Sequence, residues 1–312
     1  MNNQKMKWLY VLCGVIVIAA VVVSVTGLFN EVAGYANAEK YTAGDTVIRE
    51  PVKNLELNWT SGNVAIAYHG DQTVEIAETA NKAISEDQKL RWWLDGETLR
   101  IQFAKSGLRM NWNLDKKLTV TLPEGISLEE VKINVTSADV SIPDLKAEKL
   151  QFNATSGNAV IQAKAGKVES NQTSGDLRMT LLGDVREIAM SSTSGNTLLE
   201  AEKVGKIKAG STSGDLEINC GENEETDISS TSGAVRTNLR KIGKVKIGTT
   251  SGSVTAGLPE LPGLTAKIKT TSGQVATEMA MEKDGNTYRC GDGSGEVEIG
   301  TTSGNVKVLQ AK

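Results

Sequence analysis

Three aspartates recur at one position of a repeated pattern and are the residues best placed to perform chemistry. Asp139, Asp176 and Asp215 each follow a Thr-Ser-Gly or Thr-Ser-Ala triplet, and Asn158 and Asn196 take that position in the copies between them. Paired carboxylates on one outer face could act as general acid and base on a polysaccharide. Here neighbouring carboxylates would lie two repeats apart, about 10 Å in a stack of strands. Because Asp and Asn also favour turns, the column indicates a turn rather than an active site.

Other residue types that support catalysis are sparse. His69 is the only histidine, and the turn signal of Gly70 and Asp71 after it places it at the surface. Three cysteines are too few for a disulfide framework, and no phosphate-cradling glycine loop leads into a helix. The sequence therefore predicts a protein that is not an enzyme and has no cofactor and no metal site. The alternative is a polysaccharide-active enzyme built on a β-helix, which rests on fold analogy alone.

Four tryptophans lie between residues 51 and 130 and are the candidate ligand-binding residues: Trp59, Trp92, Trp93 and Trp112. We expect them to plug and cover the open end of a repeat stack, because such stacks need a capping element. The competing interpretation is an aromatic platform on which sugar rings stack.

The elements that position these residues follow from the Thr-Ser-Gly triplet. Its copies recur at steps of 18 to 21 residues from Thr136 to Thr271, with an outlying early copy at residues 60–62. Self-similarity at this period is typical of a solenoid. We expect glycine at each corner because it tolerates positive φ. The predicted corner glycines are Gly157, Gly175, Gly195, Gly214, Gly233, Gly252, Gly273 and Gly304.

Apolar residues alternate with polar ones on both sides of each triplet. Ile207 and Ala209 flank Lys208 before one corner, and Leu216 and Ile218 flank Glu217 after it. Period-2 alternation predicts strands with one buried face. Because the same residue types return in register, the sequence favours an all-β fold, a parallel β-solenoid of about 19-residue coils. An antiparallel meander could share the spacing and is the alternative.

The N-terminus carries a different signal. Residues 8–29 contain no charged side chain, and 22 helical residues span a bilayer core of about 30 Å. Lys5 and Lys7 precede this run, which places the N-terminus in the cytoplasm and the rest outside. The sequence predicts a single transmembrane helix in the cell membrane. The alternative is a signal peptide cleaved after Ala38, at the Ala-Asn-Ala sequence.

The predicted organisation has five parts. In chain order they are a cytoplasmic N-terminus (1–7), a transmembrane helix (8–29), a spacer (30–50), an irregular β cap (51–130) and the regular solenoid (131–312). The net charge of −4 gives no electrostatic case for nucleic acid, which binds basic surfaces. The predicted partners are therefore the membrane, through residues 8–29, and a cell-wall glycan or an envelope protein.

Several of these features together resemble the bacterial putative-adhesin family of β-strand-repeat proteins. They are the strand-rich start, a Leu-x-Val-x-Leu-Pro strand at 118–123, the triplets, and the Gly-Asp-Gly-Ser-Gly ending that begins at residue 291. The resemblance covers residues 50 to 310. It implies a β-solenoid on the outer face of the membrane, in some members anchored by one helix and linked to envelope stress. It brings no catalytic residues.

The function expected from these observations is that of a membrane-anchored cell-surface protein, an adhesin or an envelope-associated scaffold. A minor alternative is an ice- or crystal-binding face made by the column of corner threonines. Alternation of the strand positions places the Ser or Thr before each triplet on the inward side. Only the threonine of the triplet itself would then be displayed.

Overall fold

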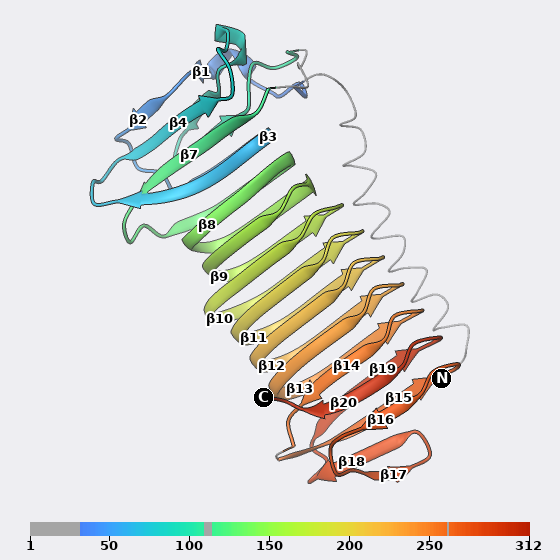
Figure 1. Ribbon diagram of the computed structural model, residues 1–312. Helices are drawn as coiled ribbons and strands as arrows, with labels where there is room; N and C mark the ends of the chain where they lie inside the picture. Colours follow the sequence, from blue (N-terminus) through green and yellow to red (C-terminus); the bar gives the residue numbers. More distant parts are fainter. Residues whose placement is uncertain (1–31, 109–113, 261) are drawn as a thin grey trace.

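The computed structural model describes residues 32–108, 114–260 and 262–312, which form one long stack of β coils (Figure 1). The predicted transmembrane helix at 8–29 and Trp112 lie outside the described residues. Within the described ranges, no helix is long and apolar enough to cross a membrane.

The middle of the stack has the predicted repeat geometry. Each strand from β9 to β13 starts after one Thr-Ser-Gly corner, crosses a looser return bend and ends at the next corner. All neighbours pair in parallel, so the parallel solenoid is confirmed over the antiparallel meander. The strands are β8 (Leu128–Ser156), β9 (Ala159–Gln172), β10 (Leu177–Ser192), β11 (Thr197–Ser211), β12 (Leu216–Ser230), β13 (Val235–Thr249) and β14 (Val254–Leu258).

In-register pairing creates the core. Leu199 of β11 lies opposite Met179 of β10 and Ile218 of β12, and all three side chains are buried. Such inward columns extend along the stack, as the alternation of the sequence predicts. Each fully buried side chain of this size stabilises the fold by about 1.5–3 kcal/mol.

At the N-terminal end, the order of the coils in space differs from their order in the chain. Strand β3 (Asn54–His69) contains the early triplet and pairs with β8, where Gly62 lies opposite Ala138. Its other edge pairs in parallel with β6 (Thr98–Gln102) and β7 (Lys116–Pro123). The early triplet is therefore outlying only in sequence, because its coil lies inside the stack.

The C-terminal end shows the same exchange. After β14 the chain runs outward to β15 (Gly263–Thr270) and β16 (Val275–Thr277). It then returns as β19 (Gly295–Thr301) and β20 (Val306–Gln310). These last strands pair with β13 and β14 on one side and with β15 and β16 on the other. The last coil of the sequence is thus the penultimate coil of the stack.

Charge patterning explains why the exchanged order is favoured at the C-terminal end. Lys246 lies opposite Glu298, which in turn lies opposite Lys267. A stack that followed chain order would place Lys246 beside Lys267 instead. Opposite charges in directly paired positions contribute roughly 0.2–1 kcal/mol, whereas like charges there destabilise. Insertion of the last coil therefore converts a repulsive pair into two attractive ones.

Short antiparallel strands close both ends. They are β1 (Thr42–Ala43), β2 (Thr46–Ile48), β4 (Val74–Ala80) and β5 (Arg91–Asp95) at one end, and β17 (Glu282–Asp284) and β18 (Thr287–Gly291) at the other. The outermost of these strands have two or three residues, and all three of β17 are exposed. Very short or charged edges oppose strand-to-strand association between molecules.

The predicted spacer at residues 30–50 is wrong from Val32 onward, because this segment is part of the fold. The N–H of Val32 donates to the Leu108 carbonyl (2.8 Å), and its own carbonyl accepts from Gly107 (3.1 Å). The 3₁₀ helix η1 (Ala38–Lys40) and strands β1 and β2 follow, and η2 (Glu86–Gln88) lies near them in the same lobe. Pairing with β4 and β5 satisfies the backbone groups that a free spacer would leave to water.

Candidate functional site

The corner glycines are required mainly by close packing between coils. Gly157 and Gly175 have φ of 106° and 93°, as predicted. The other predicted corner glycines lack positive φ, so the conformational reason given for them is wrong. A Cβ on Gly195, Gly214 or Gly233 would lie closer than 3.0 Å to the carbonyl oxygen of the corner glycine in the preceding coil. The column therefore extends along the stack because backbone touches backbone at each corner.

Side chains next to each corner are also occupied by structural contacts. The buried Ser192 and Ser211 donate to the carbonyls of Gly195 (2.8 Å) and Gly214 (2.6 Å). These hydroxyls thus point inward, as alternation predicts. Only hydroxyls of the triplets themselves can then be displayed at the corners. The smaller number of displayed hydroxyls weakens the case for an ice-binding face.

The candidate carboxylates bind the backbone of the next coil. Asp139, Asp176 and Asp215 accept the N–H groups of Asn158 (2.8 Å), Asn196 (3.0 Å) and Ala234 (2.8 Å). The hydrogen bond from Arg236 is the main cause of a lowered pKa for Asp215. A general acid needs a raised pKa, so this environment does not prepare a proton donor.

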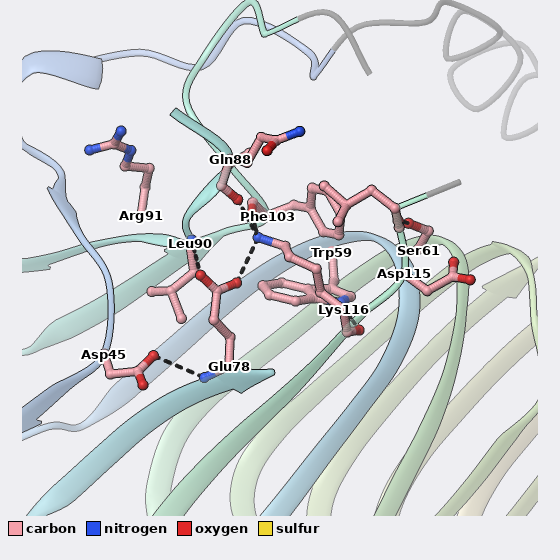
Figure 2. Close-up of polar contacts among 12 residues, drawn as sticks. Asp45, Trp59, Ser61, Glu78, Gln88, Leu90, Arg91, Phe103, Asp115 and Lys116 are labelled. Carbon is pink, nitrogen blue, oxygen red and sulfur yellow. Dashed lines mark hydrogen bonds and ion pairs between the residues drawn. The ribbon is translucent and has the colours of Figure 1, made fainter. Parts of the chain in front are cut away.

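Trp59 lies in the core beneath the N-terminal lobe, not on a platform (Figure 2). Its indole is 2% exposed, meets Phe103 edge-to-face at 4.9 Å and donates to the Lys116 carbonyl at 3.3 Å. The Lys116 ammonium lies 4.9 Å from the Trp59 ring centroid. Ligand rings therefore cannot reach Trp59, whose role is to fill the space beneath the cap.

A buried ion pair holds this cap together. The Lys116 Nζ contacts Glu78 Oε2 at 2.7 Å and donates to the carbonyls of Gln88 (2.8 Å) and Phe103. Glu78 Oε1 accepts the Leu90 N–H at 2.7 Å (Figure 2). Burial lowers the pKa of Lys116, and the bond to Glu78 opposes that shift. Because three acceptors surround the ammonium, we assign this lysine a structural role rather than that of a nucleophile.

The neighbouring tryptophans of β5 have different surroundings. Successive side chains of a strand point to opposite faces, so Trp92 and Trp93 cannot share one platform. Trp92 packs against the core, and its Nε1 is buried. Trp93 instead meets the Tyr41 ring edge-on at 5.6 Å, and Tyr41 lies 4.8 Å from the ring of Tyr35. Among the described residues, the alternative of a tryptophan platform is thus reduced to Trp93, joined by Tyr35 and Tyr41 from the supposed spacer.

A groove of about 390 Å³ crosses strands β10 to β13 where they approach the return bends. Two outward columns line it, seven and nine residues after the threonine of each triplet: Thr180, Glu200, Asn219 and Asn238, and Leu182, Glu202, Gly221 and Arg240. The volume is within the range of ligand sites. The sequence analysis missed these residues, although the repeat alignment places them in two columns separated by one inward position.

The groove offers both donors and acceptors. Glu200 accepts from the Thr180 hydroxyl (3.2 Å), and Glu202 accepts the Gly183 N–H (3.2 Å). Among the described residues no carboxylate forms an ion pair with Arg240, whose guanidinium lies over Gly221. A Cβ on Gly221 would lie closer than 3.0 Å to the Glu202 carbonyl oxygen and 3.1 Å from Arg240 Nη2, so the close approach of these two residues excludes a side chain at this position.

Cys220 contributes an inert thiol to the groove wall. Its side chain is 2% exposed, and burial raises its pKa to about 11. Cys290 of β18 is partly exposed, and both cysteines are free thiols. We predict that iodoacetamide at pH 8 modifies Cys290 at least ~10²-fold faster than Cys220, because the reagent attacks an accessible thiolate. Peptide mapping by mass spectrometry measures both rates, and equal rates would show that the coil around Cys220 opens readily.

Comparison with known proteins places the chain in one family. The Toastrack DUF4097 family model matches residues 52–309. A putative adhesin structure from Bacteroides fragilis NCTC 9343 has 16% identity and a TM-score of 0.44, covering 86% of this chain and 97% of that chain. A putative cell adhesion protein from Clostridium sporogenes ATCC 15579 has 15% identity and a TM-score of 0.22, covering 86% and 100%. No curated protein matches the chain.

Proposed function

The chain belongs to the Toastrack DUF4097 family, and on this premise we propose that it is a non-enzymatic cell-surface protein that binds a polymer of the cell envelope. The groove across β10 to β13 is the observation that carries the proposal. It runs along the stack rather than along one strand, so a ligand lying in it contacts four successive coils. Coils repeat at about 4.8 Å, so an extended chain could make similar contacts at each step.

The groove chemistry favours a polyhydroxylated polymer, such as a cell-wall glycan. Carboxylate and amide oxygens of Glu200, Glu202 and Asn219 can accept from sugar hydroxyls, and Arg240 can donate to hydroxyl or carboxylate oxygens. The partly exposed side chain of Leu182 suits the carbon face of a sugar ring. Enzymatic cleavage is disfavoured, since the aspartate column is engaged in backbone contacts and the groove contains no histidine.

We also propose that residues 8–29 anchor the stack in the cell membrane, with the β domain outside the cell. The supporting observations are the uncharged run of 22 residues and the lysines that precede it. Cleavage after Ala38 is less compatible with the fold, because Val32 and Tyr35 are bound to the lobe. A chain starting at Val32, rather than near residue 40, is therefore the appropriate soluble form for binding assays.

Arg240→Ala is expected to weaken glycan binding by about 10-fold or more. Hydrogen bonds to a charged group contribute about 1.5–3 kcal/mol, and the substitution removes the groove's guanidinium without leaving a buried carboxylate unpaired. Pull-down with purified cell-wall glycan, followed by titration calorimetry, measures the change. The matched control is Arg178→Ala, an exposed arginine on β10 that does not line the groove.

Two results would count against this proposal. If no envelope glycan binds the unaltered protein, the polymer is wrong. If Arg240→Ala and Arg178→Ala weaken binding equally, recognition does not occur in the groove. Turnover of a glycan substrate would instead revive the enzymatic alternative.

A further inference from the structure

We propose that Tyr35, Lys40, Tyr41 and Trp93 form a membrane-contact surface, which seats the N-terminal lobe on the lipid headgroups. This surface is called the aromatic seat below. The inference rests on the proposed anchor at residues 8–29, and it adds a second point of contact that fixes how the stack stands on the membrane.

The first argument is the shortness of the connection. The apolar run ends at Phe29, and Val32 is already fixed to the lobe by two backbone hydrogen bonds with residues 107 and 108. Three residue steps reach at most about 11 Å even when fully extended. The headgroup layer on each side of a bilayer is about 5–8 Å thick. The connection between the anchor and the lobe is therefore too short for the lobe to move away from the membrane surface.

The second argument is the position of Tyr35. Its N–H donates to the Ser106 hydroxyl (3.2 Å) and its phenol donates to the Ala104 carbonyl (3.1 Å), so the ring is fixed only three residues after Val32. From Tyr35 the rings of Tyr41 and Trp93 continue in contact at 4.8 and 5.6 Å. The aromatic seat thus begins next to the point where the chain leaves the membrane.

The third argument is chemical. Tyrosine and tryptophan concentrate at membrane interfaces, where an apolar ring and a polar tip are both accommodated. All three rings are partly exposed, unlike Trp59. The Lys40 ammonium lies 4.8 Å from the Trp93 centroid, and no carboxylate of the described residues forms an ion pair with it. Its charge is therefore available to a lipid phosphate.

Several other basic side chains of the lobe are already paired, whereas Arg49 and Lys82 form no ion pair with the described residues. Lys89 binds Glu86 at 2.7 Å, Lys105 binds Asp87 at 3.2 Å, and Arg100 binds Glu56. The lobe as a whole is therefore not a polybasic surface. Aromatic insertion, assisted by one lysine, is the favoured mode of contact.

The inference has a geometric consequence. The lobe occupies one end of the stack, and β17 and β18 occupy the other (Figure 1). From the corner of Gly62 to that of Gly273 the stack is roughly 40 Å long, at about 4.8 Å per coil. A seated lobe would hold β17 and β18 away from the bilayer and leave the groove between the two ends accessible.

The test compares labels at the two ends of the full-length chain in vesicles of phosphatidylglycerol and phosphatidylcholine. With the native cysteines replaced, a fluorophore is attached to Glu39→Cys in η1 or to Lys283→Cys in β17, both exposed positions. A lipid with a nitroxide on its headgroup quenches at short range. We expect at least about threefold stronger quenching at position 39 than at 283. Combining Lys40→Ala with Trp93→Ala should reduce the quenching at position 39 by half or more.

The outcomes separate the seat from the anchor. Equal quenching at both positions, or no response to the double substitution, overturns the aromatic seat while the chain remains bound to vesicles. A chain that does not stay with the vesicles overturns the anchor and the seat together. Circular dichroism of each variant, compared with that of the unaltered chain, confirms that a loss of quenching does not come from unfolding.

Discussion

Gly214→Ala is expected to destabilise the protein by about 3 kcal/mol or more, although it adds only one methyl group. The new Cβ would overlap the carbonyl oxygen of Gly195, an atom of the backbone that cannot rotate away. Overpacking in a rigid site typically costs about 1–3 kcal/mol, and here the two coils must separate to relieve it. The φ of Gly214 is outside the positive range, so the effect would come from packing and not from backbone strain. Urea unfolding of the chain from Val32 onward measures the change.

Gly300→Ala is the matched control. Gly300 is in β19, four residues before another corner glycine, and a Cβ there would meet no atom within 4 Å. Because alanine loses less conformational entropy than glycine, this variant should be neutral or more stable by up to about 1 kcal/mol. A Gly214→Ala chain as stable as the Gly300→Ala chain would show that the coils are not in backbone contact at the corner.

Breaking the buried ion pair is expected to have a similarly large effect. Glu78→Gln leaves the Lys116 ammonium, whose side chain is 0% exposed, without its carboxylate. Lys116→Met leaves the Glu78 carboxylate buried with the Leu90 N–H as its remaining donor. Removing one partner of a buried pair typically costs about 3–5 kcal/mol, because the other charge remains without compensation. Thermal and urea unfolding of the two single variants measure the loss.

The double variant and a neighbouring lysine make this test specific. Glu78→Leu combined with Lys116→Met removes both charges, so we expect it to be clearly more stable than either charge-breaking single variant. Lys117→Met is the control, because Lys117 is exposed and points to the other face of β7. If Lys116→Met costs no more than Lys117→Met, water must reach the pair and the lobe is not a closed cap.

Much of the fold could be predicted because it is repetitive. Alternation at positions such as Ile207, Ala209 and Ile218 fixed which side chains face inward, since a strand has only two faces. The repeat also predicted parallel pairing in register. The repeat gave the positions of the corner glycines but the wrong reason for most of them. A side chain is excluded there because the backbones of neighbouring coils are in contact, and one repeat alone does not show this contact.

The candidate site was predicted less well. From the sequence, the four tryptophans are expected to act as one group. The fold instead buries Trp59 and places Trp92 and Trp93 on opposite faces of β5. It also brings Tyr35 and Tyr41 next to Trp93. Aromatic composition does not state which face a ring occupies in an irregular strand. The two columns that line the groove could have been found from the sequence, since they follow the same repeat as the core.

The sequence by itself determined the coil: its length, its corners, its inward columns and the Asp/Asn position after each corner. These features repeat, and each depends on contacts between equivalent positions of adjacent coils. Only the tertiary structure decided the order of coils at the two ends. Strand β3 lies between β8 and β6, although β6 follows it in the chain, and β19 lies between β13 and β15, although β15 precedes it. Repeats of nearly equal apolar pattern can stack in several orders. The choice between them depends on paired charges such as Lys246 and Glu298 and on the strands that close each end, which no single repeat contains.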